Sequence, residues 1–155
     1  MAPQTHEPVM QETSCEATGL RILVVEDNAD CALIMAMLLR REGHEVRIAG
    51  DAAQAMREAG ASRPDVVVLD IGLPTMSGHD LAEWLRRHQP GLAPMIIVVT
   101  GYANESRRRR SLEVGVDLHL VKPFPANELL APIRRFQQLV RRSEGPKCAQ
   151  LNWAG

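Results

Sequence analysis

The fold of this chain is decided by residues 64–74, which read Pro64-Asp65-Val66-Val67-Val68-Leu69-Asp70-Ile71-Gly72-Leu73-Pro74. Four consecutive apolar residues without polar alternation are typical of a strand covered on both faces in a parallel sheet. Asp70 follows directly, at the strand end where open α/β sheets place their ligand chemistry. Because Asp is also a common turn residue after a strand, the role of Asp70 depends on the rest of the chain.

Four further segments have the composition of strands: residues 21–25, 44–49, 95–99 and 116–121. Helices are predicted at residues 30–42, 51–59, 79–88, 104–114 and 126–142. Strand and helix therefore alternate five times, which requires right-handed crossovers and a parallel sheet with helices on both faces. The sequence predicts a flavodoxin-like, doubly wound α/β fold, (βα)5, with a five-stranded parallel sheet and five helices.

The composition limits the class of protein. The 155 residues are 45% hydrophobic and carry a net charge of −1, which fits one globular domain and predicts neither nucleic acid nor a membrane as partner. We expect a flexible leader at residues 1–18, a folded domain at 19–142 and a flexible tail at 143–155. The three cysteines have no pairing or metal-ligand spacing, and no signal peptide is evident, which predicts a cytoplasmic protein.

Two predicted helices have unusual features. The helix at 30–42 has two apolar faces, so it is either covered on both sides or binds a partner. One face carries Cys31, Ile34, Met35, Leu38 and Leu39, and the opposite side carries Ala32, Leu33, Ala36 and Met37. Pro132 lies inside the last helix and predicts a kink or an altered helix start there.

The predicted strand ends carry a set of reactive groups. Glu26 and Asp27 follow the first strand and Asp70 ends the third, while Thr100 and Lys122 follow the fourth and fifth. In a parallel sheet all these ends lie on one edge. The sequence therefore brings three carboxylates, one hydroxyl and one ammonium together. His79 and His88 fall in a helix away from this edge and are expected at the surface.

The charges at this edge predict a cofactor. Two carboxylates about 4 Å apart repel by about 4 kcal/mol at an effective dielectric constant near 20. One lysine cannot compensate three carboxylates, so either one of them takes up a proton or a cation binds. A hard divalent cation with oxygen ligands, Mg²⁺, fits this set. The metal and Lys122 would neutralise phosphoryl oxygens and Thr100 would donate a hydrogen bond to one of them. Asp70 could then attack phosphorus as a nucleophile.

Residues 20–142 resemble the receiver domain of bacterial two-component response regulators. The matching segments are Ile22-Leu23-Val24-Val25-Glu26-Asp27-Asn28, Asp70-Ile71-Gly72-Leu73-Pro74-x-Met76-x-Gly78, Val99-Thr100-Gly101 and Val121-Lys122-Pro123-Phe124. The segments around Thr100-Gly101-Tyr102 and Gly115–Pro123 look most like receivers attached to hybrid sensor kinases.

This resemblance implies that Asp70 accepts a phosphoryl group from a phosphohistidine on a histidine kinase or phosphotransfer protein. The chain would phosphorylate itself and slowly dephosphorylate itself, without turning over other substrates as an enzyme does. Asp27, Asp70 and the backbone carbonyl of Gly72 would ligate Mg²⁺, with Glu26 acting chiefly through water. Thr100 and Lys122 would contact the phosphoryl oxygens, and a cis peptide bond would precede Pro123.

The resemblance also implies a conformational switch in which Thr100 moves toward the phosphoryl group and an aromatic residue of the fifth strand turns inward. His119 stands at that second position, where Tyr or Phe is more usual. The response is expected on the face formed by residues 104–114, 116–121 and 126–142, which would bind a downstream protein or a second copy of this chain. Arg107–Arg110 make that face basic, either as a solvated surface with local ion pairs or as a site for an acidic partner.

Two other functions use similar residues. A phosphatase of the haloacid dehalogenase type needs the same Asp, Thr and Lys, but it carries a second Asp two places after the nucleophile, where this chain has Gly72. A flavin-binding module would need a phosphate loop after the first strand, and Glu26-Asp27 would repel a phosphate there. A phosphorylatable receiver is therefore the preferred hypothesis for the function.

Overall fold

The computed structural model describes residues 19–89 and 93–143. Its strands are β1 Arg21–Val25, β2 Glu45–Ala49, β3 Val66–Asp70, β4 Met95–Thr100 and β5 Leu118–Val121. Its helices are α1 Ala29–Arg41, α2 Ala52–Ser62, α3 Gly78–His88, α4 Glu105–Glu113 and α5 Ala126–Ser143. All strand pairs are parallel, in the order β2-β1-β3-β4-β5. This is the predicted flavodoxin-like fold.

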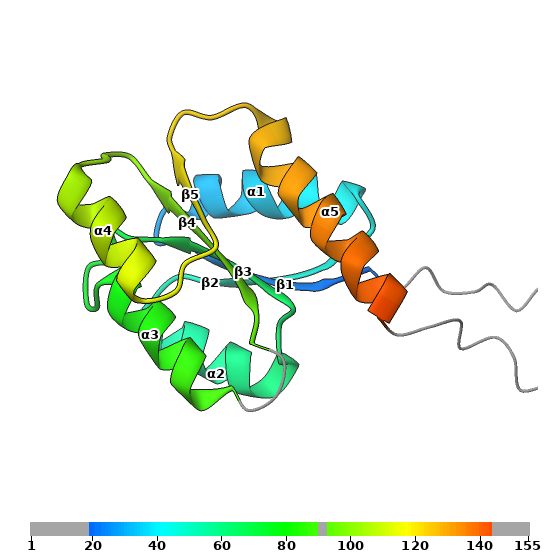
Figure 1. Cartoon of the computed structure of the whole chain (residues 1–155), viewed down its shortest axis with the longest axis horizontal. Coiled ribbons are helices and arrows are strands. Elements are labelled where there is room, and N and C mark those ends of the chain that lie inside the picture. The colour runs from blue at the N-terminus through cyan, green and yellow to red at the C-terminus, as the bar shows by residue number, and fades with distance from the viewer. Residues whose placement is uncertain (1–18, 90–92, 144–155) are drawn as a thin grey trace, which may run out of the picture.

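The sheet is covered on both faces, with α1 and α5 on one side and α2, α3 and α4 on the other (Figure 1). Neighbouring residues of a strand point to opposite faces. Val24 and Val68 accordingly join the core beneath α1 and α5, while Val25 and Leu69 join the core against α2 and α3. The unbroken apolar runs of β1 and β3 are explained by these two cores.

The register of the sheet brings the strand ends together. Val25 lies beside Leu69 in β3, so the residues that follow β1 lie beside the end of β3. Asp70 is paired with Val99, and Thr100 with Val121, one residue before Lys122. The five groups predicted to share one edge of the sheet therefore do so.

Helix α1 buries residues from both of its apolar sides. Asn28 caps its start, and Gly43 follows its end with φ of +90°. Ile34, from the first of the two apolar faces, is 59% exposed. The buried positions are Ala32, Met35, Ala36 and Leu39, drawn from both predicted sets. Because both sides are apolar, hydrophobicity alone did not define the rotation; the small alanines lie against the sheet and Leu33, Ile34 and Met37 face solvent.

Helix α5 contains Pro132 and starts at Ala126, so the alternative of an altered start at the proline is wrong. The Pro ring lies in the second turn, and the helix continues on both sides of it. The kink stays a prediction. The leader at 1–18 lies outside the described residues, as do residues 144–155 of the predicted tail, whose first residue, Ser143, ends α5. Among the described helices, none combines the length and apolar character needed to cross a bilayer.

A buried histidine makes the stability of the fold depend on pH. Nδ1 of His44 accepts a hydrogen bond from Leu20 N at 3.1 Å, and the residue is 6% exposed. Burial lowers the pKa of His44 in the folded chain, while the charge of Glu42 partly opposes this shift. The neutral ring is therefore the form that the fold stabilises, because protonation would remove the acceptor.

We predict that the free energy of unfolding is at its full value above the ordinary histidine pKa of about 6.5 and falls as the pH drops through the lower folded-state pKa. His44→Gln removes this titration. It should also lower the free energy of unfolding at pH 8 by about 1 kcal/mol, because the hydrogen bond from Leu20 N is altered. Urea unfolding at pH 8, 6.5 and 5 measures both effects. Equal pH slopes for the wild type and the variant would contradict the assignment to His44.

Candidate functional site

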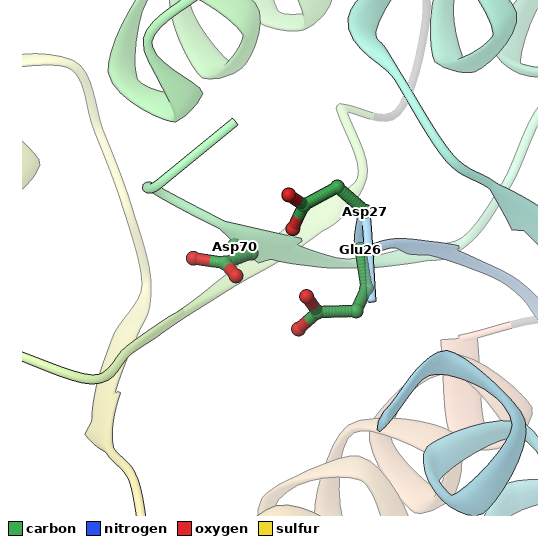
Figure 2. A group of neighbouring side chains, drawn as sticks. All are labelled: Glu26, Asp27 and Asp70. Atoms are coloured by element: carbon green, nitrogen blue, oxygen red, sulfur yellow. The ribbon is translucent and has the colours of Figure 1, made fainter. Parts of the chain in front are cut away.

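Three carboxylates converge at the edge of the sheet. Glu26 and Asp27 follow β1, and Asp70 ends β3. Each offers a carboxylate oxygen, and these three oxygens lie within 4.8 Å of one another. Figure 2 shows the three side chains extending from two adjacent strands toward a common space. The sequence prediction that these residues meet is confirmed.

Lys122 is the cation of this cluster. Its Nζ lies 2.5 Å from Oε2 of Glu26 and 3.5 Å from Oδ2 of Asp70. The lysine follows β5, and the peptide bond between Lys122 and Pro123 is cis, as predicted. One ammonium group thus bridges the carboxylates of two different strands, whereas Asp27 forms no ion pair with any described residue.

The electrostatics show that the negative charge is only partly compensated. Burial raises the pKa of Glu26, which is 2% exposed, and the charge of Asp70 adds to the effect. Hydrogen bonds from Lys122 and from the backbone N–H of Asn28 act in the opposite direction without cancelling it. Burial alone would lower the pKa of Lys122, but the hydrogen bond to Glu26 and the charge of Asp70 raise it. Lys122 is therefore firmly protonated.

The loop after β3 orients Asp70. Its Oδ1 accepts a hydrogen bond from Gly72 N at 2.8 Å. Gly78 is essential to this geometry, because a Cβ there would lie 2.6 Å from the backbone oxygen of Asp70 and 2.7 Å from the Cα of Ile71. Only glycine lets α3 begin so close to the strand. The sequence showed Gly78 as part of a motif but gave no sign of this contact. Ligation by the Gly72 carbonyl stays a prediction.

Thr100 is buried at the end of β4, with 2% exposure. Its hydroxyl donates to Tyr102 O at 2.9 Å and accepts from Tyr102 N at 3.2 Å. The backbone oxygen of Thr100 accepts from Lys122 N at 2.7 Å. Thr100 thus lies beside Lys122. Its hydroxyl is hydrogen-bonded to the backbone of Tyr102, and the bond to Tyr102 O must break before the hydroxyl can donate to another oxygen.

His119 and His79 meet at the same serine. His119 Nδ1 lies 3.3 Å from Ser111 Oγ, and His79 Nε2 lies 2.8 Å from the same oxygen. His79 is 5% exposed, so its predicted surface position is wrong; α3 turns this residue toward α4. His88 is exposed as predicted. The sequence missed Ser111 and His79 because their contact depends on how α3 packs against α4.

The chain is thus a doubly wound α/β protein with three carboxylates, a threonine and a lysine at one edge of its parallel sheet. Residues 22–134 match the family model described as the response regulator receiver domain. The chain therefore belongs to the response regulator receiver domain family.

Named relatives and solved structures agree with this assignment. The sensory transduction protein RegX3 of Mycolicibacterium smegmatis is 40% identical over 113 residues, 73% of this chain and 48% of the relative. The probable transcriptional regulatory protein TcrX of Mycobacterium tuberculosis is 40% identical, over 79% of this chain and 50% of its own. The chain thus spans about half the length of these curated relatives.

Among solved structures, a CheY-like response regulator receiver domain protein from Methanospirillum hungatei is 31% identical with a TM-score of 0.74, covering 83% of this chain and 100% of its own. The chemotaxis response regulator CheY4 of Vibrio cholerae is 27% identical with a TM-score of 0.71, over 77% and 99% of the two chains. The phosphatase and flavin alternatives gain no support from any of these. The finer likeness to receivers of hybrid kinases stays a prediction.

The crowding of carboxylates predicts a gain in stability when one is neutralised. Asp27→Asn removes a charge close to Glu26 and Asp70, so we expect the free energy of unfolding in EDTA and low salt to rise by about 1 kcal/mol. The gain should shrink in 0.5 M KCl, because exposed charges are screened. Urea unfolding under the two conditions measures this. A destabilised variant in low salt would contradict the description of the cluster.

Proposed function

We propose that this chain is a phosphorylatable signalling receiver that takes a phosphoryl group from a phosphohistidine onto Asp70. The observation that carries the proposal is the single ammonium of Lys122 placed between Glu26 and Asp70, at 2.5 and 3.5 Å, in a cluster with a surplus of carboxylates. This arrangement suits a phosphoryl group that binds together with a cation, because Lys122 and the cation can then neutralise the phosphoryl oxygens.

The donor set fits Mg²⁺. Carboxylate oxygens are hard ligands of the kind that Mg²⁺ prefers, and three residues offer such oxygens within 4.8 Å. One ammonium group, that of Lys122, stands against these three carboxylates. Asp27, Asp70 and the Gly72 carbonyl would hold the ion, with Glu26 acting through water. When bound, the ion supplies positive charge that neutralises phosphoryl oxygens.

Four residues of the chain have separate roles in the proposed phosphoryl transfer. A carboxylate oxygen of Asp70 forms the new bond to phosphorus while the bond from phosphorus to the donor's imidazole nitrogen breaks. The Gly72 N–H, 2.8 Å from Oδ1, keeps the carboxylate oriented during the attack. Lys122, positioned beside Oδ2, would turn from Glu26 to a phosphoryl oxygen. The Thr100 hydroxyl would exchange Tyr102 O for another phosphoryl oxygen.

The same geometry favours retention of the group over turnover of other substrates. Gly72 stands where an aspartyl phosphatase has its second acid, and it offers no side chain to activate an attacking water. Self-phosphorylation and slow self-dephosphorylation are therefore the only reactions that we propose for this chain.

The surface near the site suits protein partners. Leu33, Ile34 and Met37 of α1 are 49%, 59% and 55% exposed, and α1 begins two residues after Asp27. We propose that this apolar face binds the phosphohistidine donor, a histidine kinase or phosphotransfer protein. A cytoplasmic location is proposed with it, from the resemblance.

The face formed by α4, β5 and α5 would bind the downstream protein or a second copy of this chain. Tyr102 and Leu112 are 65% and 77% exposed near it. Arg109 pairs with Glu105, and Arg110 lies within 4.0 Å of Asp80, Glu83 and Glu113. These contacts support a solvated surface with local ion pairs for this part of the arginine run.

Incubation with acetyl phosphate and Mg²⁺ should add the mass of one phosphoryl group to the intact protein. Asp70→Asn should abolish the addition, since an amide is not a nucleophile for phosphorus, and EDTA should prevent it. Asp80→Asn, an exposed Asp of α3, is the matched control and should be labelled like the wild type. Labelling that survives Asp70→Asn would overturn the proposal.

The donor face has its own test. Ile34→Ser leaves the site intact, so its labelling by acetyl phosphate should match the wild type. Transfer from a phosphorylated histidine kinase that labels the wild type should fall about tenfold, as expected for removing one buried apolar side chain from an interface. Equal transfer rates would place the donor elsewhere on the surface.

A further inference from the structure

A buried polar cluster connects α3, α4 and β5 beside the site. It comprises His79, Ser111 and His119, with Ser111 Oγ 2.8 Å from His79 Nε2 and 3.3 Å from His119 Nδ1. Ser111 is 3% exposed, and its hydroxyl also lies 3.0 Å from the backbone oxygen of Arg107. Neither the metal cluster nor the phosphoryl transfer described above uses these groups.

The proton positions in this cluster are assigned from the orientation of the serine hydroxyl. A serine hydroxyl has one proton and two lone pairs. Ser111 Oγ is oriented to donate to the Arg107 carbonyl, so we assign both imidazoles as donors to Ser111 Oγ. In this assignment His119 is neutral and protonated on Nδ1, and the nitrogen without a proton is its buried Nε2, which has no hydrogen-bond partner among the described residues. Burial lowers the pKa of His79 and of His119, which agrees with neutral rings at pH 7.

Arg107 joins this cluster to Thr100. Its guanidinium donates to Tyr102 O at 3.3 Å, the same oxygen that accepts from the Thr100 hydroxyl. The guanidinium carbon also lies 5.7 Å from the centre of the Tyr102 ring. The side chain of Arg107 thus contacts Tyr102 O, the acceptor of the Thr100 hydroxyl. The backbone oxygen of Arg107 contacts Ser111.

We propose that Ser111 is the positioning residue of the switch: its hydroxyl fixes the His119 ring against α4 and, through Arg107, ties that ring to Thr100. The hydrogen bond that holds His119 is then one of the contacts that must break when Thr100 moves to the phosphoryl group. The inference about the switch rests on the proposed function; the inference about the position and tautomer of His119 rests on the cluster alone.

The test uses three variants of the full chain. Ser111→Ala removes the hydroxyl, Ser111→Thr keeps it, and Ser106→Ala makes the same change at an exposed position of α4. The tautomer of His119 is read from its imidazole nitrogen shifts by NMR, assigned with His119→Gln. The rate of labelling by acetyl phosphate with Mg²⁺ is read in parallel by intact mass.

We expect protonation on Nδ1 in the wild type, in Ser111→Thr and in Ser106→Ala, and a shift to the Nε2 tautomer in Ser111→Ala. Labelling of Ser111→Ala should be about fivefold faster, the effect of releasing one neutral hydrogen bond that opposes the competent state. The same tautomer in the wild type and Ser111→Ala, or equal labelling rates, would overturn the inference. A tautomer shift in a chain that takes no label would refute the proposed function and leave the positioning of His119 supported.

Discussion

One ammonium group set against three carboxylates is the constraint on which the described site depends. Lys122 reaches Glu26 and Asp70 because four strand ends share one edge of the sheet, and they share it because every crossover between parallel strands returns the chain to the same end. The cluster is costly in isolation, since one lysine does not remove the repulsion. This surplus of negative charge makes the site suited to a cation.

Much of this edge could be predicted from the sequence, because the physics there is local. An unbroken apolar run predicts a strand buried on both faces, and the residue after the run then falls at the sheet edge, as Asp70 does. Lys122 and Thr100 follow by the same argument. Family membership places the whole arrangement among the response regulator receivers, although glycine contacts such as that of Gly78 could be found only in three dimensions.

The errors occurred where the outcome depends on packing between elements. Two apolar sides on α1 left open which of them would be buried; the helix buries residues of both, and Ile34 is exposed. His79 was placed at the surface because its partner, Ser111, lies on a different helix. The hydroxyl of Thr100 is bonded to Tyr102 O in its own turn, a contact that the sequence did not predict. None of these contacts follows from periodicity or spacing.

Asp70 and the two residues of the proposed switch, Thr100 and His119, have different hydrogen-bond partners. Asp70 is oriented by Gly72 and Lys122, whereas Thr100 and His119 are held by the turn at Tyr102 and by α4. In the proposed switch, a group bound at Asp70 acts on α4 by drawing Thr100 away from that turn. With histidine at position 119, the ring is held by a hydrogen bond between its Nδ1 and Ser111 Oγ.

The central claim is that Asp70 forms the bond to phosphorus. Borohydride reduces an aspartyl phosphate to homoserine, so reduction of the acetyl phosphate-treated protein followed by peptide sequencing locates the acceptor directly. We expect homoserine at position 70 and unmodified aspartate at position 27. Homoserine at position 27, or a phosphoryl group that resists borohydride, would contradict it.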